Sequence, residues 1–340
     1  MPNSFRRRFK PGGQYKRKTV LLFFGVFVLI AAFSMALSRA SQSDNRRDNY
    51  AINITAREVV LHVTVTDHRG NFVFGLGPDN FQVYEDGVAQ KIAYFVHEDI
   101  PVTVGLVVDN SGSMRAKRNY VIAGAEALAR SSNSRDEIFV VNFNENVSFG
   151  LPGNLPFTDN TAQLETALSR SAPSGQTALY DAIAAALAHL KVGTRDKKVL
   201  VVISDVGDNA SKTTGAAVKA AAAHADALIY TIGIFDEQDR DQNPRALKQL
   251  AKESGGEAFF PSQLKEIVPI CERIAREIRS QYTIAYVPAD GALTGAYRAI
   301  AVKANAEGRG RLSVRTRAGY FAQSSEATSP EASTRPSPIK

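Results

Sequence analysis

Apolar runs and helix-period segments alternate through the middle of the chain. Four of the apolar runs are continuous, as expected for strands that are covered on both faces. Two amphipathic segments, 178–190 and 263–278, place their leucine and isoleucine residues on one helical face. Strands and helices in alternation are typical of a doubly wound α/β fold, in which helices flank a mostly parallel sheet. The four runs are Val102–Val108, Ile138–Val141, Val199–Ile203 and Leu228–Ile234.

The flanks of this region alternate with a period of two instead. Between residues 59 and 96, apolar positions such as Leu61 and Val63 alternate with polar ones, and turn sequences such as Asp86-Gly87 interrupt the pattern. The strand pattern returns near the end of the chain, at 282–287, 297–304 and 312–316. We expect these two sets of strands to pair across the central region as a small β-sandwich-like unit.

The N-terminal segment has the pattern of a membrane anchor. Residues 1–18 are basic, and residues 19–37 contain no charged side chain; as a helix these 19 residues would span about 28 Å. Basic residues hold their side of such a helix in the cytoplasm, so the folded part should face the periplasm or exterior from a single-pass inner-membrane anchor. The alternative is secretion after signal-peptide cleavage near the small residues Ser38 and Ala40.

The pattern divides the chain into seven predicted segments. The polar segment after the anchor resembles a linker, and the end of the chain is rich in Ser, Thr, Pro and Ala, as in disordered tails. The segments are a cytoplasmic segment (1–18), a transmembrane anchor (19–37), a linker (38–50), an N-terminal β unit (51–98), a central α/β domain (101–289), C-terminal strands (290–321) and a disordered tail (322–340).

Composition removes several classes of function. The net charge of +7 equals the charge of the seven basic residues before position 19, so the rest of the chain has no excess of basic residues for a nucleic acid partner. The single cysteine, Cys271, excludes an internal disulfide and a cysteine-based zinc cluster. The sequence contains no HExxH, P-loop, GxSxG or GxGxxG motif, so the strongest sequence signs of hydrolase, nucleotide or dinucleotide chemistry are missing.

The sequence LVVDNSGSM, at 106–114, combines oxygen donors with the end of a predicted strand. Asp109 should lie at the strand tip, with Ser111 and Ser113 on either side of a tight turn at Gly112. An alternative is that Ser113 only caps the helix that begins near Arg115, while Asp109 and Asn110 make an Asx turn.

Two other segments should reach the same place. Thr177 precedes the helix predicted at 178–190, and Asp205 follows the strand that ends at Ser204. Ligands of open parallel sheets bind beyond the carboxyl ends of the strands, where all three segments fall. Two carboxylates and three hydroxyls would form an all-oxygen site for a hard divalent cation such as Mg²⁺.

These residues resemble the metal-ion-dependent adhesion site (MIDAS) of von Willebrand factor type A (VWA) domains, with its Asp-x-Ser-x-Ser, Thr and Asp pattern. The resemblance covers about 101–289 and implies a Rossmann-like fold. It also implies that Mg²⁺ or Mn²⁺ is held by Asp109, Ser111, Ser113, Thr177 and Asp205, in part through water. Segments 63–67 and 80–87 are similar to the strand unit of a bacterial, acidobacterial-type VWFA-related subgroup, which usually has glycine where this chain has Val206.

Two carboxylates and three neutral hydroxyls would leave the ion a free coordination position, which a partner's Asp or Glu can complete. We therefore expect a non-enzymatic, membrane-anchored binding module whose partner is a protein presenting an acidic residue. Two alternatives remain: a structural scaffold with an incidental metal, and a metal-dependent hydrolase with Asp208 as base.

Asp208 and Asn209 together suggest either a second ion site or, more commonly, a turn and helix cap. In the family the last helix, here 263–278, can shift when ligand binds.

Overall fold

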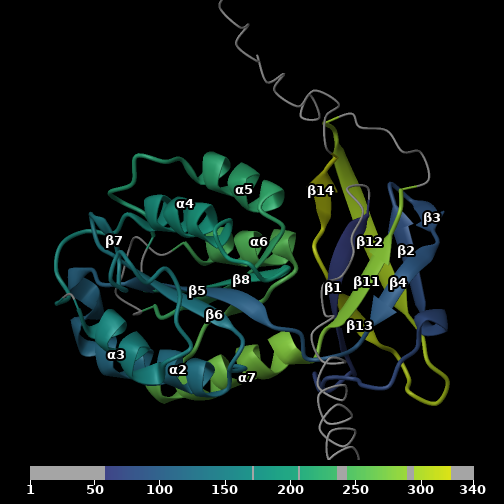
Figure 1. Ribbon diagram of the computed structural model, residues 1–340, viewed down its shortest axis with the longest axis horizontal. Coiled ribbons are helices and arrows are strands. Elements are labelled where there is room, and N and C mark those ends of the chain that lie inside the picture. The colour runs from purple at the N-terminus through teal and green to yellow at the C-terminus, as the bar shows by residue number, and fades with distance from the viewer. Residues whose placement is uncertain (1–57, 171, 206, 236–242, 289–294, 323–340) are drawn as a thin grey trace, which may run out of the picture. The chain divides into compact units, whose positions relative to one another are not determined.

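Six strands form a mostly parallel sheet in the central part of the protein (Figure 1). Every residue of the central strand β5 (Val102–Asp109) is buried, which explains its continuous apolar sequence. Its parallel neighbours are β6 (Glu137–Phe143) and β8 (Lys197–Ser204), and β8 pairs in turn with β9 (Ala227–Gly233). The edges are β10 (Ala258–Phe259), parallel to β9, and β7 (Val147–Phe149), antiparallel to β6. The predicted mostly parallel sheet is therefore confirmed.

Helices cover both faces of this sheet. Figure 1 shows α4, α5 and α6 on one face and α2, α3 and α7 on the other. The helix expected near residue 115 begins with a 3₁₀ turn, η2, and the one expected at 263–278 begins with another, η3. The helical segments are η2 (Gly112–Ala116), α2 (Arg118–Arg130), α3 (Thr161–Ser169), α4 (Leu179–Leu190), α5 (Gly215–His224), α6 (Pro244–Ser254), η3 (Leu264–Glu266) and α7 (Ile267–Arg279).

The flanking strands pair across the central region, as predicted. Strand β1 (Val59–Thr66) lies between β11 (Tyr282–Tyr286) and β13 (Ser313–Arg315), and β4 (Ile92–Val96) completes this antiparallel sheet. A second antiparallel sheet has the order β14-β12-β2-β3, and inward side chains of both sheets form one apolar core. Its strands, with a preceding 3₁₀ turn, are η1 (Pro78–Asn80), β2 (Phe81–Glu85), β3 (Val88–Gln90), β12 (Tyr297–Ala304) and β14 (Gly319–Phe321).

The structure, a computed structural model, describes residues 58–170, 172–205, 207–235, 243–288 and 295–322. These residues fall within one compact unit. The predicted cytoplasmic segment, membrane anchor and linker lie outside them, as do Val206 and the predicted tail beyond residue 322. Among the described helices, none is long and apolar enough to cross a bilayer.

A buried carboxylate in the last turn of α7 joins the two parts of this unit. Glu277 is fully buried, and its Oε1 atom accepts hydrogen bonds from Thr64 Oγ1 on β1 (3.0 Å), Tyr230 OH on β9 (2.8 Å) and Arg315 Nη2 on β13 (2.6 Å). Burial raises the pKa of Glu277, and the Arg315 guanidinium opposes that rise. One side chain thus ties the central sheet to the adjacent strands β1 and β13 of the flanking sheet.

Removal of this carboxylate should destabilise the fold strongly. We expect Glu277→Ala to lower the free energy of unfolding by about 3 kcal/mol or more, because it leaves two buried hydroxyls without their acceptor and removes one of the two carboxylates that Arg315 contacts. Urea unfolding followed by circular dichroism measures this. The matched control Glu165→Ala, on an exposed position of α3, should change stability by less than about 0.5 kcal/mol. Equal effects of the two substitutions would contradict the role given to Glu277.

Candidate metal site

The two predicted carboxylate ligands lie at the carboxyl ends of two neighbouring central strands. Asp109 is the last residue of β5, and Asp205 directly follows β8. Both side chains are buried, with relative exposures of 1% and 0%. Because the strands are parallel and adjacent, their ends bring the two carboxylates to one edge of the sheet.

Asp109 is held by donors from its own turn and from β8. Its Oδ1 atom accepts a hydrogen bond from the Ser111 amide (2.8 Å), and its Oδ2 atom accepts one from Ser204 Oγ (2.5 Å). Burial raises the pKa of Asp109 to about 6, against the lowering effect of these hydrogen bonds. The Asx turn considered as an alternative from the sequence is therefore present. Ser204 is a second partner of Asp109 that sequence reasoning missed.

Hydroxyl groups connect this turn to Asp205. Ser111 Oγ lies 3.1 Å from Ser113 Oγ, and Ser113 Oγ donates to Asp205 Oδ1 at 3.0 Å. Ser113 is exposed, whereas Ser111 and Asp205 are buried, so the cluster is accessible from the Ser113 side. Ser111, not Ser113, is the N-cap residue of η2, and it makes no side-chain capping bond. Ser113 therefore does not have the capping role considered as an alternative.

The loop that carries Thr177 packs against the serine turn. The Gly112 amide donates to the Gly175 carbonyl at 3.1 Å, and Gly175 has a φ of +77°, a conformation that glycine adopts without strain. Thr177 is buried, and its amide donates to Asn209 Oδ1 at 2.8 Å. The structure thus joins Asp109 to Ser111 through the Ser111 amide, and Ser111, Ser113 and Asp205 through their side chains. It brings the Thr177 loop to this turn through a backbone contact.

A buried lysine also belongs to this cluster. Lys117 has a relative exposure of 3%, and its Nζ atom lies 2.7 Å from Asp205 Oδ2 and 3.0 Å from the Ile234 carbonyl. Sequence reasoning missed it. A signal was available in the sequence, because Lys117 has the three- and four-residue spacing of one helical face with the apolar residues Met114 and Val121. In the structure these two apolar residues are each 1% exposed.

The polar residues after Asp205 act as caps. Asp208 Oδ1 accepts from the Tyr180 amide (3.2 Å) at the start of α4, and Asn209 Oδ1 accepts from the Thr177 amide. The arrangement matches the turn and helix cap rather than a second ion site. In the described part of the chain, no three His, Cys, Asp or Glu side chains are grouped so that they could hold a metal. A cation at the rim of the sheet would therefore depend on hydroxyl oxygens as well as on two carboxylates.

The chemistry of this donor set fits a hard divalent cation. Its side-chain donors are carboxylate and hydroxyl oxygens, the ligand types that Mg²⁺ and Mn²⁺ favour over nitrogen or sulfur. The buried carboxylates are preorganised by hydrogen bonds, and the exposed Ser113 leaves an approach from solvent. The ligand assignment itself remains a prediction.

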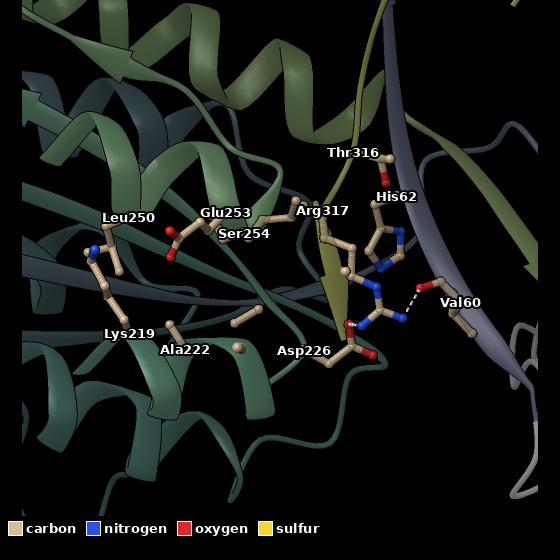
Figure 2. Close-up of a pocket in the computed structure, with 14 residues that line it drawn as sticks. Val60, His62, Lys219, Ala222, Asp226, Leu250, Glu253, Ser254, Thr316 and Arg317 are labelled. Atoms are coloured by element: carbon tan, nitrogen blue, oxygen red, sulfur yellow. Dashed lines mark hydrogen bonds and ion pairs between the residues drawn. The ribbon is translucent and has the colours of Figure 1, made fainter. Parts of the chain in front are cut away.

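A separate cavity lies away from the predicted metal site. It lies between β1 and the α5–β9 region and has a volume of about 30 Å³, room for roughly one or two water molecules (Figure 2). Arg317 reaches across it, pairing with Asp226 and donating from Nη2 to the Val60 carbonyl at 2.7 Å. None of the predicted metal ligands lines this cavity. Its size and its ion pair fit a structural junction.

Comparison with known proteins identifies the central domain. Residues 104–208 match the family model described as the von Willebrand factor type A domain, and this segment contains all five predicted ligands. The chain carries a VWA domain. No curated protein sequence matches the chain.

Several solved structures are similar to part of the chain. The vWF domain of the type V pili tip protein Mfa5 from Porphyromonas gingivalis is 15% identical with a TM-score of 0.44, over 54% of this chain and 96% of that domain. A von Willebrand factor type A protein from Catenulispora acidiphila is 13% identical with a TM-score of 0.48, over 81% of this chain and 76% of that one. The PilB minor pilin from Streptococcus sanguinis is 12% identical with a TM-score of 0.39, over 54% and 63%.

The raised pKa of Asp109 gives the metal-free VWA domain a defined pH dependence. A folded-state pKa near 6, above the usual 3.8, means that the stability contributed by protonated Asp109 is full below the unfolded pKa and lost as pH rises through 6. We therefore expect Asp109→Asn to stabilise the metal-free protein by about 1–3 kcal/mol at pH 8, and by progressively less as pH falls toward 4. Thermal unfolding in chelator across this range measures it. A pH-independent difference would contradict the burial argument.

Proposed function

We propose that the protein is a binding module whose VWA domain engages a protein partner through Mg²⁺ or Mn²⁺ at the rim of the sheet. The observation that carries the proposal is the continuous hydrogen-bonded cluster from Asp109 through the Ser111 amide and the Ser111 and Ser113 hydroxyls to Asp205, buried except at Ser113. Burial of two carboxylates costs free energy of folding. Because this pair lies at the edge of the sheet where α/β folds bind ligands, the burial is better explained by a function than by stability.

The chain's own groups have distinct roles in this proposal. Asp109 and Asp205 would supply the negative charge that attracts the cation, and the hydroxyls of Ser111, Ser113 and Thr177 would supply neutral oxygen ligands. A bound divalent ion would supply a positive centre for an acidic side chain. Ser204 would hold the Asp109 carboxylate in position from the neighbouring strand.

We further propose that residues 19–37 anchor this module in the membrane, with the folded part outside the cytoplasm. The support is the uncharged 19-residue stretch and the seven basic residues before it. Secretion after cleavage of the same stretch is the alternative, and mass spectrometry of the mature N-terminus distinguishes the two.

A scaffold function is the second candidate, and one observation favours it. Protein donors already reach both oxygens of each carboxylate: the Ser111 amide and Ser204 on Asp109, and Ser113 and Lys117 on Asp205. A cluster satisfied in this way can be a purely structural element. The hydrolase alternative has less support, because the carboxylate of its candidate base, Asp208, is used at the start of α4.

Calorimetry of the cation distinguishes the binding module from the scaffold. We expect the chelator-treated full chain in detergent to bind one Mg²⁺ or Mn²⁺, and Asp109→Ala to bind at least about 100-fold more weakly, since loss of a direct ligand should cost no less than loss of a second-shell group. Ser113→Ala, at an exposed position, tests the same site with little risk to folding. Asp159→Ala removes an exposed carboxylate and should bind like the wild type. Absence of binding by the wild-type chain would favour the scaffold.

The partner's chemistry can be tested separately. The immobilised chain should retain glutamate-containing peptides in Mn²⁺ and release them in chelator, because the acidic group is held through the ion. Asp109→Ala should retain none of them. Retention that survives chelation would contradict a metal-bridged contact.

A further inference from the structure

Lys117 is a buried cation placed directly against a predicted metal ligand. Its side chain is 4% exposed and that of Asp205 is 0% exposed, and 2.7 Å separates Lys117 Nζ from Asp205 Oδ2. The same Nζ atom donates to the Ile234 carbonyl, just beyond β9, at 3.0 Å. Two neighbouring strand ends, those of β8 and β9, therefore hold the ammonium group.

The backbone around Lys117 does not explain why a lysine occupies this position. Lys117 is the N-cap residue of α2, and its side chain makes no capping bond. A positive charge is unfavourable at a helix N-terminus, where the helix dipole favours anions. Burial of an ammonium is costly as well. The compensating interaction is the Asp205 carboxylate, so the lysine is matched to the site rather than to the helix.

The charges at the rim of the sheet show what this lysine changes. Asp109 and Asp205 contribute −2 and Lys117 contributes +1, a net charge of −1. A divalent ion would make the site +1, and one incoming carboxylate would make it neutral. Without Lys117 the two aspartates alone would neutralise the ion, and the site would need no further anion.

We propose that Lys117 makes retention of the divalent ion conditional on an acidic ligand, so that ion and carboxylate bind cooperatively. This inference rests on the proposed metal-dependent function. Lys117 acts as a positioning and charge-setting residue. It binds the Oδ2 atom of Asp205, so the other oxygen, Oδ1, faces Ser113 and the serine hydroxyls. The same lysine weakens binding of the ion alone. Because coupling between two ligands is reciprocal, binding of the acidic ligand then depends more strongly on the ion.

The test measures the Mn²⁺ affinity of the full chain in detergent under two conditions of equal ionic strength. One contains acetate as the carboxylate probe, and the other contains chloride. Electron paramagnetic resonance of free Mn²⁺ gives the bound fraction. In wild type, acetate should tighten Mn²⁺ binding about threefold or more. Lys117→Met should bind Mn²⁺ alone at least about tenfold more tightly than wild type, because a nearby positive charge is gone, and should respond less to acetate.

Two further variants separate charge from packing. Lys117→Arg keeps the positive charge and should retain the wild-type Mn²⁺ affinity and acetate response. Arg115→Met removes an exposed positive charge from the same turn, where water and salt screen it, and should change the affinity less than about threefold.

The outcomes are distinct. If wild type binds Mn²⁺ and Lys117→Met binds no more tightly, the inference is overturned while the proposed function stands. If Lys117→Arg binds as tightly as Lys117→Met, packing rather than charge controls the affinity, and the inference is overturned as well. If Lys117→Met does not fold, the wild-type acetate response decides, and its absence overturns the inference. If neither wild type nor any variant binds Mn²⁺ with or without acetate, the metal-dependent function itself fails.

Discussion

Two carboxylates, Asp109 and Asp205, are buried at the ends of adjacent parallel strands, and the polar contacts at the rim of the sheet follow from this placement. Each carboxylate needs hydrogen bonds or a countercharge, because an isolated buried anion is far less stable than a hydrated one. Ser204 and the Ser111 amide meet this need for Asp109, and Ser113 and Lys117 meet it for Asp205. The serine turn, the Lys117 side chain and the strand order β8-β5 therefore form one electrostatic unit.

The same requirement appears at the opposite end of the VWA sheet. Lys197, the first residue of β8, is fully buried, and its ammonium group bonds to the Ile278 carbonyl at the end of α7. Burial lowers the pKa of Lys197 to about 7, and nearby Glu277 opposes the shift. Glu277 in turn binds residues of β1 and β13. The end of α7 is thus held by charged groups from the central sheet and from the flanking strands, Lys197 and Arg315.

Much of this arrangement could be predicted from the sequence. Continuous apolar runs indicated strands covered on both faces, and period-two alternation at the flanks indicated that N- and C-terminal strands pair. The specific pairing of β1 with β11, in which Val63 faces Tyr282, came from the structure. The convergence of LVVDNSGSM and Asp205 followed from the rule that parallel strands end at one edge. The roles of Lys117 and Ser204 could not be predicted, because each partner lies about 90 residues away in sequence, at separations of 88 and 95. Lysine is mostly exposed in proteins, and this general expectation outweighs the helical spacing of Met114, Lys117 and Val121.

The central claim is that the buried carboxylates and the serine turn form a cation site, and anomalous diffraction tests it most directly. Crystals soaked in Mn²⁺ and measured at the manganese edge should show one strong peak, about 2.0–2.3 Å from the hydroxyl oxygens of Ser111 and Ser113. The account predicts that this peak is absent from crystals of Asp109→Ala. No peak at the rim of the sheet in wild-type crystals, or a peak that persists in the variant, would contradict the account.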